Sequence, residues 1–262
     1  MFKKLVSIGL SLMMMLGVTG YAPVSVQAAD DGHLGSVTSV EVDADDKNIV
    51  WVTFDNGYQG KITFLDNDIF RYNVDPSGQF NEYAQVHNGY PDTAKIQQYP
   101  DSSDAYSHPE ASVQQNGNSY EIKAGNVTIS FDEAARMSIK AGDKTVMEEE
   151  ESLDFQGART VQTLVKHDAT NYDPSLPENF FGGGTQNGRF VHTGNVINIS
   201  NESNWVDGGV ASPSPFYYTT NGYGVLRNTY MDGSYDFGST DANTVTARHN
   251  ENEFDAYYFV SD

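Results

Sequence analysis

The sequence predicts an all-β protein folded as an antiparallel β-sandwich. Short runs of alternating apolar and polar residues recur along most of the chain, and turn-forming residues separate them. Beyond the N-terminal region, no segment has the apolar spacing of an amphipathic helix of usual length. Aromatic residues that favour half-buried strands are abundant, with 16 Tyr and 14 Phe among 262 residues. Because short paired strands need a second sheet to cover their apolar face, we expect two packed sheets.

The first part of the sandwich is predicted as a series of hairpins. Its expected strands lie around residues 40–42 and at 48–54, 61–65 and 69–74. The pair Asn56-Gly57 stands between two alternating runs, which is a strong hairpin signal. A second turn is expected at residues 66–68, between the third and fourth strands.

Residues 79–115 are less regular, and they are expected to form a long surface segment. Strands then resume, at residues 119–124, 126–131, 137–140, 145–147 and 160–167. A run of four carboxylates, at residues 148–151, is expected to form a solvated loop edge rather than a cation site.

Residues 1–28 have the organisation of a signal peptide. Lys3 and Lys4 are followed by an apolar segment, and Val26-Gln27-Ala28 fits a small-residue cleavage site. The alternative is an uncleaved anchor, although the apolar segment is short for a membrane span. We therefore expect a secreted or cell-surface protein whose single β-sandwich domain covers residues 29–262, with no membrane span after cleavage.

The composition excludes several classes of function. A net charge of −21 repels nucleic acid and anionic membranes, and it suits a neutral substrate. The chain has no cysteine, no H-E-x-x-H and no G-x-S-x-G, and its six histidines are scattered. Asp43, Asp45 and Asn48 resemble part of a calcium loop, but a hairpin turn explains them better. We expect no metal and no cofactor.

Residues 179–218 hold the densest group of candidate binding residues. Two aromatics, Phe180 and Phe181, precede three consecutive glycines at 182–184, and a polar cluster and an Asn- and Gly-rich loop follow. Glycines allow close backbone approach or unusual dihedral angles. Such loops would suit a sugar, which has polar hydroxyls and flat apolar faces. They would equally suit ordinary turns of an all-β protein.

Three segments resemble glycoside hydrolase family 31, and they occur in the order found in that family. Residues 180–184 are similar to its F-Y-G-L-G-E segment, 215–238 to its P-F-x-x-S-x-x-G-Y-G-L segment, and 253–260 to the strand that precedes its catalytic barrel. The phrases GGGTQNGRF and NWVDGGVASPSPFY are closer to the α-galactosidase and α-N-acetylgalactosaminidase-like branch. The resemblance implies a galactose-mutarotase-like sandwich, the N-terminal domain of such an enzyme.

The resemblance also implies where catalysis would occur. Retaining glycosidases use two carboxyl groups about 5 Å apart, and in this family both belong to a later (β/α)8 barrel. We therefore assign no catalytic residue to this chain and expect it to be inactive alone. Its expected partners are that missing barrel and a carbohydrate substrate.

In the family, one loop of the sandwich reaches the sugar, and the matching residues here lie at 204–207. Trp205 would stack on an apolar sugar face, while Asn204 and Asp207 would hydrogen-bond to hydroxyls. Alternatively, Trp205 packs under the loop and Asp207 caps the following turn. For Gln186, Asn187 and Arg189 a structural duty is expected. His192 near the glycines is expected to be structural too.

Two other functions stay open. A stand-alone carbohydrate-binding or adhesion module would bind sugar independently, and a mutarotase-type epimerase would need a paired histidine and carboxylate. If the chain packs on a barrel, the isolated chain should expose apolar patches near Phe180, Phe181, Trp205 and Phe216.

Overall fold

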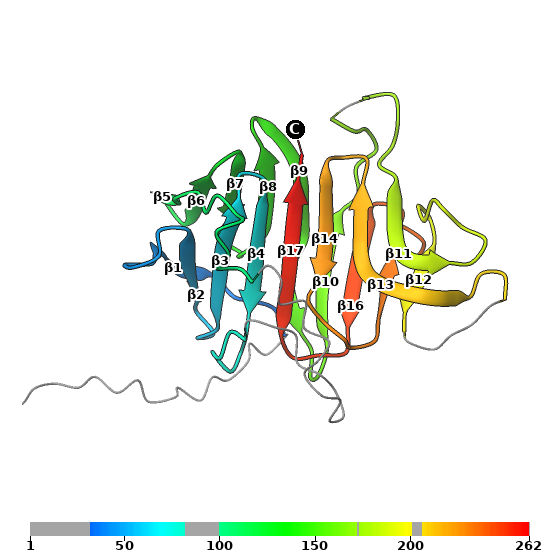
Figure 1. The fold of residues 1–262 in the computed structure, drawn as a ribbon, viewed down its shortest axis with the longest axis horizontal. Helices are drawn as coiled ribbons and strands as arrows, with labels where there is room; N and C mark the ends of the chain where they lie inside the picture. Colours follow the sequence, from blue (N-terminus) through cyan, green and yellow to red (C-terminus); the bar gives the residue numbers. More distant parts are fainter. Residues whose placement is uncertain (1–31, 82–99, 172, 201–205, 262) are drawn as a thin grey trace, which may run out of the picture.

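Two antiparallel β-sheets face each other in the computed structural model, which describes residues 32–81, 100–171, 173–200 and 206–261 (Figure 1). This arrangement confirms the predicted all-β sandwich. The described residues contain no helix long and apolar enough to cross a membrane. The predicted signal peptide lies outside the described residues.

The first sheet has eight strands, and it forms the front layer in Figure 1. In spatial order its strands are β1 (Val37–Val42), β2 (Ile49–Phe54), β3 (Gln59–Asp66), β4 (Ile69–Val74), β17 (Phe254–Val260), β14 (Tyr223–Arg227), β13 (Val210–Thr219) and β11 (Phe180–Gln186). The last strand of the chain, β17, thus lies in the middle of the sheet between β4 and β14.

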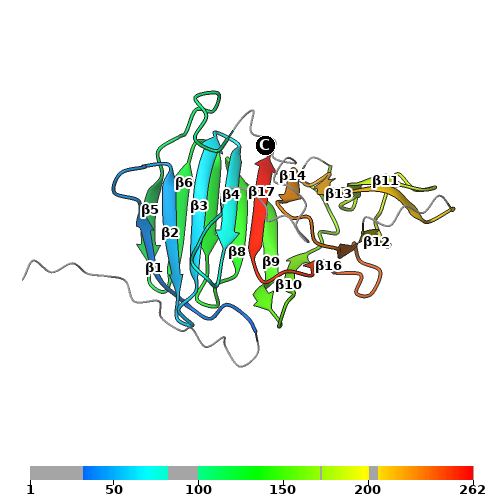
Figure 2. The same ribbon diagram turned by 60° about the horizontal axis from the view of Figure 1, so that its bottom comes forward.

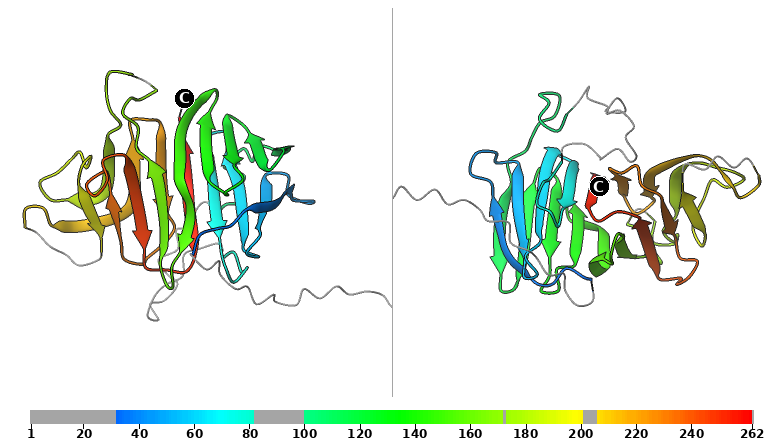
Figure 3. Two further views of the ribbon diagram at one scale, coloured as in Figure 1. Left: turned by 180° about the vertical axis from the view of Figure 1, so that it is seen from behind. Right: turned by 90° about the horizontal axis from the view of Figure 1, so that it is seen from below.

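The second sheet has nine strands and is seen from its own side in Figure 3, left. In spatial order its strands are β12 (Val196–Ile199), β15 (Gly233–Asp236), β16 (Thr244–His249), β10 (Thr160–Val165), β9 (Lys144–Phe155), β8 (Met137–Ala141), β7 (Val127–Phe131), β6 (Ser119–Ala124) and β5 (Ser112–Asn116).

The core lies between the two sheets, which Figures 2 and 3 show from further directions. Phe70 of β4 stacks on Tyr258 of β17, with ring centroids 4.8 Å apart. Tyr72 meets Phe131 of the opposite sheet at 6.0 Å. These fully buried rings supply much of the apolar area that favours folding.

The predicted hairpins are confirmed. The turn at Asn56-Gly57 joins β2 to β3, where the Gly57 N–H donates to Phe54 O at 2.9 Å. Asp43 organises the turn between β1 and β2, because its carboxylate accepts bonds from the Trp51 indole and two backbone N–H groups. These bonds, led by the one from Trp51, lower the pKa of Asp43 to about 2.

Three regions differ from the sequence prediction. The irregular segment at 79–115 ends in strand β5, which pairs with β6. The glycine-rich stretch at 180–186 is strand β11 rather than a loop. The proline-containing stretch is also a strand, β13, whose first part pairs only with β11 and so leaves Pro213 on an open side.

The carboxylate run at 148–151 also differs from the sequence prediction. It belongs to the long strand β9, and Glu149 is only 6% exposed. Its carboxyl group accepts bonds from Gln162 Nε2 at 2.9 Å and from the Met137 N–H at 2.8 Å. Glu148, Glu150 and Glu151 are exposed as expected, so the prediction is wrong in two respects: the run is a strand rather than a loop, and Glu149 points into the interior.

Candidate functional site

One face of the eight-stranded sheet points away from the core, and we call it the outer face. Along β17, Tyr258 is fully buried in the core whereas Phe259, next to it, is 37% exposed on the outer face. The β-sheet register extends this outer row across the neighbouring strands, because paired residues project to the same side.

An aromatic strip crosses the outer face from β11 to β17. Phe181 stacks on Tyr218 at 5.3 Å, and Phe216 meets Tyr218 at 6.0 Å and Phe259 at 5.8 Å. Phe190 extends the strip and is 75% exposed. These five rings form a contiguous, partly exposed apolar surface. Apolar patches of this kind often mark the sites where a protein binds a partner.

The expectation of apolar patches is thus confirmed for Phe181 and Phe216 and wrong for Phe180. Phe180 is fully buried and stacks on Phe237 at 4.8 Å. Successive strand residues point to opposite faces, so the first of the two adjacent phenylalanines enters the core and the second joins the strip.

The three glycines of β11 shape one end of this face. All three have positive φ, between 72° and 107°, and the register with β13 shifts between Gly182 and Gly184. A side chain on Gly182 or Gly184 would collide with the backbone of β13. The sequence interpretation, close approach together with unusual dihedral angles, holds for both positions.

The described part of the predicted sugar-contacting loop lies against Gly188, just after β11. Asn204 and Trp205 lie outside the described residues, so their roles stay predictions. Asp207 is exposed, and its Oδ1 lies so close to Gly188 that a side chain there would collide with it. The turn after Asp207 is closed by the Gly209 N–H donating to Val206 O at 2.9 Å.

The polar residues that follow the glycines have structural contacts. Gln186 Nε2 donates to Gly183 O at 2.7 Å, Asn187 Nδ2 to Val206 O at 2.9 Å, and Arg189 Nη1 to Asn195 Oδ1 at 2.8 Å. His192 is buried, and its Nε2 donates to Gly182 O at 3.0 Å. Burial lowers the pKa of His192, which keeps the ring neutral.

A buried ion pair lies where the aromatic strip meets the strands β2–β4. Arg71 Nε and Nη2 donate to the two carboxylate oxygens of Asp255, at 2.7 and 2.6 Å. Its Nη1 donates to Asp101 Oδ2 at 2.7 Å. Burial disfavours the charged guanidinium, but the charge of Asp255 outweighs it and raises the pKa of Arg71. Arg71 therefore ties the loop at Asp101 to the sheet.

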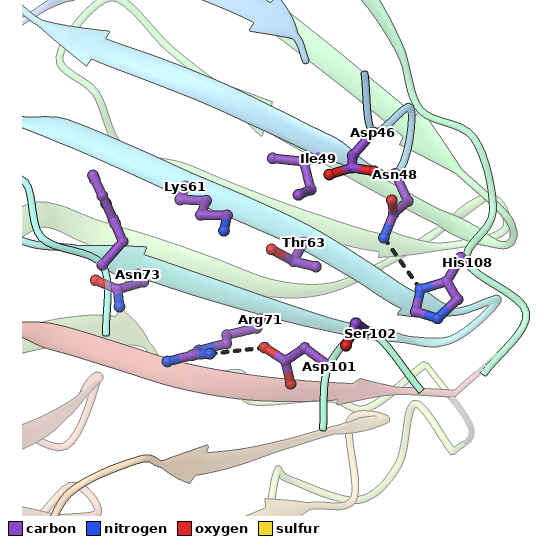
Figure 4. A pocket seen from close by; sticks show the side chains of 11 residues that line it. Asp46, Asn48, Ile49, Lys61, Thr63, Arg71, Asn73, Asp101, Ser102 and His108 are labelled. Carbon is purple, nitrogen blue, oxygen red and sulfur yellow. Dashed lines mark hydrogen bonds and ion pairs between the residues drawn. The ribbon is translucent and has the colours of Figure 1, made fainter. Parts of the chain in front are cut away.

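Two cavities border the eight-stranded sheet, and the smaller one is also lined by Ile199 of the nine-stranded sheet. A cavity of about 580 Å³ lies over β2, β3 and β4, and Figure 4 shows the side chains that line it. A smaller one, of about 370 Å³, lies beside the aromatic strip, between Pro213 and Pro215 of β13 and the segment after β14. The strip and the smaller cavity adjoin each other through Leu226, which is paired with Phe216.

The structure also brings together a histidine–carboxylate cluster that no sequence motif indicated. His167 Nδ1 lies 3.0 Å from Glu178 Oε2, and its Nε2 lies 3.4 Å from Glu148 Oε2. These carboxylates, Glu178 above all, raise the pKa of His167. The cluster lines neither cavity, and it joins β9, β10 and the segment before β11.

Comparisons with known proteins agree on the fold. Residues 59–236 match the family model described as the glycosyl hydrolase 31 N-terminal galactose mutarotase-like domain. A search of the curated proteins finds no significant match.

Solved structures with this fold include a Flavobacterium johnsoniae GH31 dextranase, a cycloalternan-forming enzyme from Listeria monocytogenes and a GH31 α-xylosidase from a soil metagenome. Their TM-scores are 0.69, 0.66 and 0.61, at 16%, 15% and 15% identity. The matches cover 88%, 88% and 86% of this chain but only 27%, 21% and 32% of those chains.

Proposed function

Since the chain belongs to the family of glycosyl hydrolase 31 N-terminal galactose mutarotase-like domains, we propose that it is the N-terminal portion of a secreted, retaining α-glycosidase. The family match over residues 59–236 is the observation that carries the proposal. The similar enzymes are three to five times longer than the part that this chain matches, which leaves room in such proteins for a separate catalytic domain.

In this proposal the sandwich packs on a (β/α)8 barrel through the aromatic strip. The strip presents adjacent aromatic rings from three strands. Aromatic residues are enriched in the buried centres of protein interfaces. Covering the strip would also remove its rings from water, at roughly 25 cal/mol per Å² of apolar surface.

The loop at residues 204–207 would complete the substrate pocket. Asp207 is exposed and its carboxylate has no hydrogen-bond partner among the described residues, so it is available to accept bonds from sugar hydroxyls. Trp205 would stack on the sugar ring and Asn204 would hydrogen-bond to it. No residue of this chain is assigned to the chemical step, so the chain alone is inactive.

A terminal α-galactoside or α-N-acetylgalactosaminide is the proposed substrate. The support is the likeness of GGGTQNGRF and NWVDGGVASPSPFY to that branch. Export is supported by the signal-like segment at residues 1–28.

The proposal is tested on the protein expressed from the complete reading frame. Hydrolysis of nitrophenyl α-N-acetylgalactosaminide, α-galactoside and α-glucoside is compared, and proton NMR identifies the first anomer released. We expect release of the α-anomer, and an increase in KM for Asp207→Ala with a smaller change in kcat. Hydrolysis by the present chain alone, or release of the β-anomer, would contradict the proposal.

A further inference from the structure

The 580 Å³ cavity over β2–β4 takes no part in the proposed barrel contact, and its size is typical of sites for small molecules. Its floor is the outer face of three adjacent strands, where Ile49 pairs with Thr63 and Lys61 pairs with Asn73. The loop around Asp101 and His108 forms one wall (Figure 4).

Two residues that line the cavity have strained backbones. Phe80 and His108 have φ of 49° and 45°, and they are two of the three non-glycine residues with positive φ in the described part of the chain. A phenylalanine rarely adopts this conformation, whereas histidine adopts it more readily than most residues, so Phe80 is the more unusual of the two. Such strain persists only where the surroundings hold it, and it is concentrated at functional sites.

Specific contacts hold both strained residues in place. Asp75 Oδ2 accepts the backbone N–H of Phe80 at 3.2 Å, and the Phe80 ring meets Trp51 edge-on at 5.1 Å. The His108 N–H donates to Leu65 O at 3.0 Å. Its Nε2 donates to Ser103 O at 3.0 Å, so its Nδ1 accepts from Asn48 Nδ2 at 3.2 Å. The wall is therefore built and fixed before any ligand arrives.

Two hydrogen-bonding side chains, Thr63 and Lys61, face this space. Asn73 beside them is 3% exposed: its Nδ2 donates to Glu253 Oε1 at 2.9 Å, and its Oδ1, although without a partner among the described residues, is closed to solvent. The Thr63 hydroxyl and the Lys61 ammonium also have no hydrogen-bonding partner in the described ranges. Lys61 and Thr63 are alternate residues of β3, so both lie on the face that forms the cavity floor (Figure 4).

The charges of the lining balance. Asp46 and Asp101 face Lys61 and Arg71, and the Arg71 charge is already neutralised by its carboxylate partners. Such a site offers donors and acceptors without excess charge, beside an aromatic ring. This combination matches a neutral polyhydroxyl compound better than an anion, which the whole chain at −21 would also repel.

We infer that this cavity binds a neutral saccharide of one or two sugar units, held by Thr63 and Lys61 with Phe80 against a ring face. The site would give the sandwich a sugar affinity of its own, without any contribution from a barrel. The inference does not rest on the proposed enzymatic function, because it uses only residues of β2–β4 and their covering segments.

The test is isothermal titration of the full chain with maltose, isomaltose, melibiose and N-acetylgalactosamine, alongside galacturonate and inorganic phosphate. The variants are Thr63→Val, which keeps the side-chain shape, and Lys61→Met. Matched controls are Thr53→Val, on the same face of β2 outside the cavity, and Lys123→Met, whose side chain is exposed on β6. Thermal unfolding of each variant verifies that it is folded.

We expect at least one neutral saccharide to bind, and each cavity variant to weaken binding roughly 2- to 10-fold, the loss of one hydrogen bond, while the controls bind as the wild type. Three results would overturn the inference: no neutral saccharide binds, the controls weaken binding as much as the cavity variants, or galacturonate or phosphate binds more tightly through Lys61. Barrel-dependent hydrolysis is unaffected by any of these outcomes, so the two proposals fail separately.

Discussion

The buried carboxyl group of Glu149 makes the free energy of unfolding depend on pH, and the substitution Glu149→Gln removes this contribution. Burial raises the pKa of Glu149 to about 8, although the bonds from Gln162 and from the Met137 N–H oppose this shift. Glu149 is therefore neutral in the folded chain near pH 7, whereas in the unfolded chain it ionises near its usual pKa of 4.5. The substitution Glu149→Gln keeps the shape and removes the titration.

The sign and size of the effect follow from linkage. Between about pH 4.5 and about pH 8 the folded chain holds one proton more than the unfolded chain, so its stability falls as the pH rises. Each pH unit in that window removes roughly 1.4 kcal/mol. From about pH 5.5 to about pH 7.5 the wild type should thus lose about 3 kcal/mol relative to Glu149→Gln.

Urea unfolding of both proteins across this window, followed by circular dichroism, measures the difference. Other titrating groups contribute equally to the two curves and cancel in the difference. Glu150→Gln, an exposed neighbour on the same strand, is the matched control and should give a flat difference. A flat difference for Glu149→Gln, or one that grows in favour of the wild type with pH, would refute the reasoning.

Three further predictions concern the histidine–carboxylate cluster, the buried ion pair of Arg71, and a glycine with positive φ. Because carboxylate partners raise the pKa of His167, the stabilisation that protonated His167 provides is present below about pH 6.5 and is lost as the pH rises through the raised value. His167→Gln should therefore destabilise the protein most at low pH. A loss of unfolding free energy in urea that increases with pH would contradict this. Arg71→Met leaves Asp255 buried and unpaired and should cost about 3–5 kcal/mol in urea unfolding; a loss below about 1 kcal/mol would show that the pair is not needed. Gly184→Ala, at φ +76° and against the backbone of β13, should lower the thermal midpoint more than Gly194→Ala, at φ +75° in open space; equal effects would show that only backbone strain matters.

The sequence predicted local structure well where the signal is local. Asn56-Gly57 and the alternation on either side of it specify a hairpin within a few residues, and that hairpin is present. The place of β17 was not predictable in this way. It pairs with β4, about 180 positions earlier, as Tyr257 with Arg71, and such pairing is decided by packing of the whole sandwich.

Burial of single polar residues was also beyond local reasoning. A run of four carboxylates predicts exposure to solvent. Glu149 is nevertheless buried, and Gln162 on the adjacent strand donates a hydrogen bond to its carboxyl group. Equally, adjacent phenylalanines read alike in sequence, and only the strand register separates the buried Phe180 from Phe181 on the strip.

The two sites differ in how much the sequence indicated. Phe181 and Phe216 were expected at an apolar surface because they belong to recognisable segments. The cavity over β2–β4 takes its lining from positions between 46 and 108 that form no motif, and its strained residues, Phe80 and His108, are visible only as dihedral angles.

The central claim is that this sandwich is the front portion of a glycosidase, and the coding sequence downstream of the Asp262 codon tests it most directly. The account predicts an open frame that continues into a (β/α)8 barrel with two carboxylates at its strand ends, placed about 5 Å apart as retaining hydrolysis requires. A stop codon directly after Asp262 would contradict the claim.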